Sequence, residues 1–122
     1  MATKVLIIDD DQDILDSTGS ILAGEGFEIH CADSVERGME LIEIVAPDVV
    51  LLDIVFPEST SGGLEAARNM KARYPRLPVI VFSAINREYT LAFTGEQIDA
   101  VEFLSKPVRA DKLLEIIRKR VS

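Results

Sequence analysis

Five short apolar runs alternate along the chain with longer segments of amphipathic order. Runs of this kind, separated by helical patterns, are typical of βα units. Their strands lie parallel because each crossover helix returns the chain to the same end of the sheet. The alternation therefore predicts an α/β fold, a doubly wound, five-stranded parallel sheet with helices on both faces. The predicted strands are Val5–Ile8, Phe27–Cys31, Val49–Leu52, Val79–Phe82 and Val101–Leu104.

Helix start and stop signals fall between these runs. Gly24 follows a first predicted helix over residues 12–23, because glycine readily ends helices. Ser34 is a good N-cap for a second helix, which must end before Pro47. Of the remaining expected helices, one ends at Pro75, one of weak amphipathic order spans residues 89–97, and the last carries Leu113, Ile116, Ile117 and Val121.

The length and charge of the chain limit what it can be. Its 122 residues suit a single domain spanning positions 1–122. A net charge of −8 argues against direct nucleic-acid binding, which needs a basic face. No run approaches the roughly 18 apolar residues of a membrane span, so we expect a soluble, cytoplasmic protein. Cys31 is the single cysteine. It fits a reducing compartment, and we expect it to be a small buried side chain on an edge strand.

Polar residues follow four of the predicted strands. Asp9, Asp10 and Asp11 follow the first strand, and Asp53 follows the third. Ser83 follows the fourth, and Ser105 and Lys106 follow the fifth. The carboxyl ends of parallel strands meet at one edge, here called the carboxyl edge, where open α/β sheets bind ligands.

Such a cluster of carboxylates predicts a magnesium-dependent phosphoryl-transfer site. Two carboxylates about 4 Å apart repel by about 1 kcal/mol in water and about 4 kcal/mol at an effective dielectric of 20. Mg²⁺ offsets this repulsion and suits one or two carboxylates plus phosphate oxygens. Asp53 would then be a carboxylate nucleophile, with Lys106 and the Ser83 hydroxyl contacting the transferred group.

With these motifs in place, the sequence resembles the receiver domain of bacterial two-component response regulators. The resemblance covers essentially the whole chain. Its motifs are Val5-Leu-Ile-Ile-Asp-Asp-Asp11, Pro47-Asp-Val-Val-Leu-Leu-Asp-Ile-Val-Phe-Pro57, Val79-Ile-Val-Phe-Ser-Ala84 and Phe103-Leu-Ser-Lys-Pro107.

The resemblance implies a strand order of 2-1-3-4-5, the flavodoxin-like arrangement. It implies that Asp53 accepts a phosphoryl group from a sensor histidine kinase or a His-containing phosphotransfer protein. Mg²⁺ would be held by Asp9, Asp10, Asp53 and the backbone carbonyl of Val55. The pair Asp10 and Asp11 is the alternative register within the run of three acids.

The resemblance also implies a switch and an output. Ser83 and Lys106 would bind the phosphoryl group, and Phe103 would be the aromatic switch residue. The altered surface would act on a downstream protein or a covalently attached output domain. Val55 and Ile85 are apolar, so we expect them to hinder attacking water and to give slow autodephosphorylation. The chain would not be a conventional enzyme.

Two other readings stay open. A phosphatase with a nucleophilic aspartate could use the Asp9-x-Asp11 pattern, and a pseudo-receiver would be a docking module that takes no phosphate. A dinucleotide-binding domain is disfavoured, because no Gly-x-Gly-x-x-Gly follows the first strand.

Overall fold

The structure is a computed structural model with a five-stranded parallel sheet in the order β2-β1-β3-β4-β5. It describes residues 2–53, 69–83, 101–105 and 110–121. The strands are β1 (Lys4–Ile8), β2 (Glu28–Ala32), β3 (Val49–Asp53), β4 (Val79–Ser83) and β5 (Val101–Ser105). The predicted fold class, five parallel strands and strand order are confirmed.

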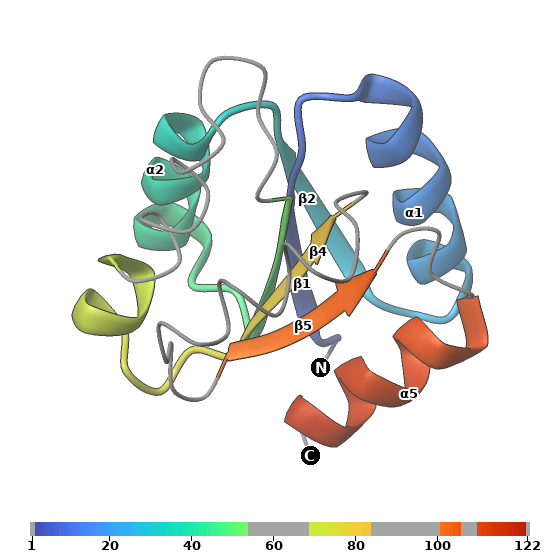
Figure 1. Cartoon of the computed structure of the whole chain (residues 1–122). Coiled ribbons are helices and arrows are strands. Elements are labelled where there is room, and N and C mark those ends of the chain that lie inside the picture. Colours follow the sequence, from blue (N-terminus) through green and yellow to red (C-terminus); the bar gives the residue numbers. More distant parts are fainter. Residues whose placement is uncertain (1, 54–68, 84–100, 106–109, 122) are drawn as a thin grey trace.

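Helices cover both faces of the sheet (Figure 1). The helix α1 (Gln12–Gly24) and the helix α5 (Ala110–Val121) lie on one face. The helix α2 (Val35–Val45) and the helical residues 69–73 lie on the other. The N-terminal strand β1 occupies an inner position, because β2 and β3 pair on either side of it. This doubly wound arrangement buries both faces of the inner strands.

Local sequence signals set the helix ends. The Ser34 hydroxyl accepts the Arg37 N–H at 3.1 Å and caps α2, as predicted. This helix ends at Val45, and its C-cap residue Ala46, directly before Pro47, adopts a left-handed conformation with φ of 55°. Gly26 has φ of 93° in the turn after α1, a value that glycine adopts without strain.

The core divides into two layers because successive strand residues point to opposite faces. In β1, Leu6 and Ile8 belong to the layer beneath α2 and residue 70, whereas Val5 and Ile7 belong to the layer beneath α1 and α5. The same alternation continues in β3, where every residue from Val49 to Leu52 is fully buried. The apolar face of α5 also buries as predicted, with Leu113, Ile116 and Ile117 inside.

One prediction on the edge strand is wrong. Cys31 is exposed rather than buried, although it lies in the predicted strand. In the part of the chain that the structure describes, β2 is paired on one side alone, so its outer side stays open to solvent.

The predicted helix over residues 89–97 lies outside the described residues. No helix within the described ranges is both long enough and apolar enough to span a bilayer.

Candidate functional site at the carboxyl edge

The strand register puts two of the predicted acids side by side along the sheet. Ile8, the last residue of β1, pairs with Leu52 in β3. Asp9 and Asp53 are therefore the next residues on two neighbouring strands. Backbones of paired strands lie about 5 Å apart, so this register brings the two positions together at the carboxyl edge.

Asp9 is held at both its backbone and its side chain. Its N–H donates to the Ala32 carbonyl at 3.0 Å, which extends the β1–β2 ladder by one residue. Its Oδ1 accepts the N–H of Asp11 at 3.0 Å. Asp9 is 0% exposed, the one buried polar side chain in the described part of the chain. A buried carboxylate needs such hydrogen bonds, because desolvation without them is costly.

Asp11 has a structural task at the start of α1. It is the N-cap, and its Oδ1 accepts the Asp13 N–H at 2.9 Å. This bond satisfies one of the donors that the first turn of a helix leaves free. Asp10 lies between the buried acid and the capping acid, and it is exposed. The three consecutive aspartates therefore sit in three different environments.

The remaining predicted site residues lie on β4 and β5 or outside the described ranges. Ser83 is the last residue of β4 and pairs with Ser105, the last residue of β5. Phe103 lies in the middle of β5, where it pairs with Val81. Lys106 follows β5 directly in the sequence, but Lys106, Val55 and Ile85 lie outside the described residues. The roles predicted for all these residues stay predictions.

The donors at this edge fit Mg²⁺ in chemical type. Asp9 and Asp10 are carboxylates that follow one strand, and Asp53 ends the neighbouring strand. Mg²⁺ takes oxygen ligands, with one or two carboxylates being enough. Among the side chains that the structure describes, no group of three or more acidic, histidine or cysteine residues could hold a metal.

Gly38 is a residue whose importance the sequence reasoning missed. It is buried in α2 directly against the end of β1. A Cβ at this position would lie 2.3 Å from Ile8 Cδ1 and 2.8 Å from Ile8 Cγ1. The available signal was a glycine in the interior of a well-patterned helix, which costs about 1 kcal/mol against alanine and so calls for a packing reason.

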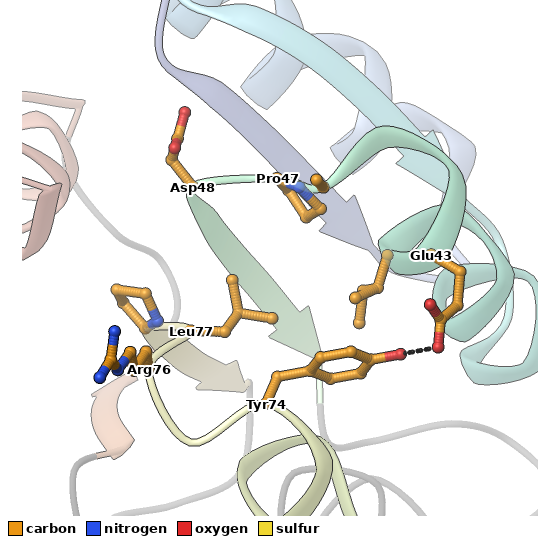
Figure 2. Close-up of a pocket in the computed structure, with 9 residues that line it drawn as sticks. Glu43, Pro47, Asp48, Tyr74, Arg76 and Leu77 are labelled. Carbon is orange, nitrogen blue, oxygen red and sulfur yellow. Dashed lines mark hydrogen bonds between the residues drawn. The ribbon is translucent and has the colours of Figure 1, made fainter.

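A concave feature lies at the edge of the sheet opposite the carboxyl edge (Figure 2). This cavity of about 440 Å³ is flanked by the end of α2 and the turn before β4. Asp48, directly before β3, lines it, whereas Asp53 ends that strand about 16 Å away. The cavity is therefore separate from the predicted acidic site. Its lining residues are Ile42, Glu43, Ala46, Pro47, Asp48, Tyr74, Arg76, Leu77 and Pro78.

Polar side chains on one wall of this cavity tie α2 to the end of the helical segment 69–73. The Tyr74 hydroxyl donates a hydrogen bond to Glu43, as Figure 2 shows. Arg73 forms an ion pair with Glu43 at 3.0 Å and lies 5.5 Å from the centre of the Tyr74 ring. The hydrogen bond to Glu43 raises the pKa of Tyr74, with a smaller contribution from burial. Glu43, Arg73 and Tyr74 are therefore partnered within the protein.

Sequence comparisons connect the chain to known signalling proteins. A family model described as the response regulator receiver domain matches residues 5–118. The regulatory protein AtoC of Escherichia coli strain K12 is 32% identical over 116 residues, which cover 95% of this chain and 24% of that protein. The chain thus spans about a quarter of the length of this curated relative.

Solved structures give the same result. A CheY-like response regulator receiver domain protein from Methanospirillum hungatei JF-1 is similar with a TM-score of 0.86 and 29% identity, covering 99% of this chain and 94% of that one. The receiver domain of NtrX from Brucella abortus is similar with a TM-score of 0.82 and 31% identity, covering 96% and 97% respectively. Both similarities extend over nearly the full length of each compared chain.

Proposed function

The chain belongs to the response regulator receiver domain family, and on that premise we propose that it accepts a phosphoryl group on Asp53. The donor is a sensor histidine kinase or a His-containing phosphotransfer protein. The observation that carries the proposal is the register Ile8–Leu52, which makes Asp53 the strand-end neighbour of the buried Asp9. The proposal thus assigns the family's general role as phosphoacceptor to one residue of this chain, Asp53.

The proposed reaction is an in-line displacement at phosphorus. A carboxylate oxygen of Asp53 forms the new O–P bond, and the P–N bond to the donor imidazole breaks with the electron pair going to nitrogen. The Lys106 ammonium and the Ser83 hydroxyl offset negative charge on the transferred oxygens. The position of Ser83 at the end of β4 supports its part in this scheme.

Asp9, Asp10, Asp53 and the Val55 carbonyl would hold Mg²⁺. The bound ion would supply positive charge next to the transferring group. The register with Asp9 and Asp10 is supported over Asp10 and Asp11, because the Asp11 carboxylate already caps α1.

The phosphorylated state is proposed to change a protein-binding surface through Ser83 and Phe103. The readout is a downstream protein or a covalently attached output domain. The chain acts as a phosphoacceptor and not as a conventional enzyme. A single free cysteine suits a reducing compartment, which supports a cytoplasmic location.

The test is the intact mass of the protein after incubation with acetyl phosphate and Mg²⁺. Wild type should gain one phosphoryl group, and Asp53→Asn should gain none. Asp48→Asn is a matched control, because Asp48 precedes the same strand and accepts the Lys4 N–H at 2.8 Å, an interaction that an amide oxygen can keep. Phosphorylation of Asp53→Asn to the wild-type level would refute the assignment.

The other two readings give different results in the same experiment. A pseudo-receiver would gain no phosphoryl group and would show no response to a beryllofluoride mimic. A phosphatase would turn over a phosphate monoester, and Asp9→Asn would abolish that turnover. The slow decay proposed for the acyl phosphate is tested by Val55→Asn, which should shorten its lifetime because the amide can orient water.

A further inference from the structure

The helix α2 packs tightly against the sheet where Gly38 faces the last residue of β1. A Cβ on Gly38 would lie 2.3, 2.8 and 3.6 Å from three side-chain carbons of Ile8. Ordinary carbon–carbon contacts lie at about 3.5–4.0 Å, so a larger residue in place of Gly38 requires a shift of the Ile8 side chain or of α2. Ile8 itself is 0% exposed and belongs to the core beneath α2.

We propose that Gly38 is a positioning residue for the magnesium site, acting through Ile8 on Asp9. This inference rests on the proposed function, because it assumes that Asp9 is part of the metal-binding pair. Gly38 itself touches neither metal nor phosphate. Because Gly38 has no side chain, α2 packs closely enough to hold the Ile8 side chain in one position. The position of Ile8 in turn fixes the position of Asp9, the next residue.

The backbone of Ile8 is held by pairing with both neighbouring strands, so it has little freedom to move when α2 shifts. Ile8 pairs with Ala32 on one side and with Leu52 on the other. The part of the displacement that the Ile8 side chain does not absorb acts on the adjoining peptide, which carries the Asp9 N–H bonded to the Ala32 carbonyl at 3.0 Å. The same movement disturbs the bond from the Asp11 N–H to Asp9 Oδ1. Close-packed interiors transmit such shifts, since they hold few voids.

The chain offers a matched control for the same substitution. Gly19 lies inside α1, and a Cβ there would lie 3.5 Å from Ile29 Cγ2, which is an ordinary contact. Gly19→Ala and Gly38→Ala therefore add the same methyl group to a helix interior. They differ in that the second methyl overlaps a residue next to Asp9.

The experiment measures Mg²⁺ affinity by isothermal titration calorimetry for wild type, Gly19→Ala and Gly38→Ala. Gly38→Ala should weaken Mg²⁺ binding by about tenfold or more, the usual size of effects from residues that support metal ligands. Gly19→Ala should bind as wild type does. The double variant Gly38→Ala/Ile8→Ala removes both carbons that the new methyl overlaps, Cδ1 and Cγ1, so it should recover affinity to within about threefold of wild type.

A readout without metal separates positioning from general destabilisation. In the metal-free protein, amide hydrogen exchange of Asp9 and Asp11 should speed up in Gly38→Ala. Exchange of amides in β3 should not change by the same factor. Ile117→Val, which thins the core on the other face, should lower the urea midpoint without moving Mg²⁺ affinity or the exchange of Asp9 and Asp11.

Each outcome decides the matter. Equal Mg²⁺ affinity in Gly38→Ala and Gly19→Ala would overturn the inference. If Gly38→Ala does not fold, the double variant must fold and bind Mg²⁺, and failure to do so also overturns it. If wild type binds no Mg²⁺, the proposed metal site and this inference fall together. If Asp9→Asn abolishes binding but Gly38→Ala leaves it intact, the positioning role alone is refuted.

Discussion

Replacing Asp11 separates the two tasks that three consecutive aspartates share. The Asp11 carboxylate accepts the Asp13 N–H at 2.9 Å at the start of α1. Loss of a capping side chain costs about 1 kcal/mol, within a range of roughly 0.5–2. Asp11→Ala should therefore lower the free energy of unfolding by about 1 kcal/mol, or the melting temperature by about 4 °C for a domain of this size.

Asp11→Asn is the informative partner of this variant. The amide oxygen keeps the cap, so the substitution removes only the charge. A negative charge at a helix N-terminus contributes about 0.3–1 kcal/mol, but repulsion from the neighbouring acids opposes it with a similar size. We therefore expect Asp11→Asn to stay within about 0.5 kcal/mol of wild type. Urea unfolding followed by far-UV circular dichroism measures both variants, since the chain has no tryptophan.

Mg²⁺ titration of the same variants then tests which acids bind the ion. Asp11→Asn and Asp11→Ala should lose only a few-fold in affinity, because they remove a screened charge and not a ligand. Asp9→Asn and Asp10→Asn should each lose more than about tenfold, since ligand charge sets affinity for a hard cation. Loss of binding in Asp11→Asn together with retention in Asp9→Asn would refute this reasoning and establish the Asp10–Asp11 register.

Three further predictions follow from local geometry. Ala46→Gly should raise the free energy of unfolding by about 0.5–1 kcal/mol in urea unfolding, because glycine adopts the left-handed φ of 55° with less strain; a lower stability would contradict this. Glu43→Gln should lower the pKa of Tyr74 in an ultraviolet titration, since the hydrogen bond to Glu43 raises that pKa. Because the pKa is higher in the folded state, the stability that this bond contributes is present below pH 10 and is lost as pH rises through the folded-state pKa. Cys31 should react with a thiol reagent in the folded protein, whereas a buried thiol would require unfolding. Partial burial and, to a smaller extent, the charge of Asp16 raise its pKa, so the rate at neutral pH should be below that of a free thiol.

Much of the fold and the order of the site residues along the chain could be read from the sequence. The strand runs of Val49–Leu52 and Val79–Phe82 are apolar because inner parallel strands are buried on both faces, and the structure has strands there. The Ser34 cap and the end of α2 before Pro47 depend on neighbouring residues alone, so local chemistry was enough to predict them. The placement of acids directly after β1 and at the end of β3 likewise needs only the strand pattern and the sequence.

The tertiary structure decided what depends on residues distant in sequence. The sequence predicted an edge strand for Cys31, but whether its side chain is covered depends on what packs against that strand in the folded chain, which the local pattern does not encode. The separate environments of Asp9 and Asp11 arise from hydrogen bonds that form once β1 has joined the sheet and α1 has begun. The need for glycine at position 38 arises from how closely α2 packs on Ile8, thirty positions earlier in the sequence. Periodicity determines which face of a segment is apolar, but the depth at which two segments pack is set only when their side chains meet.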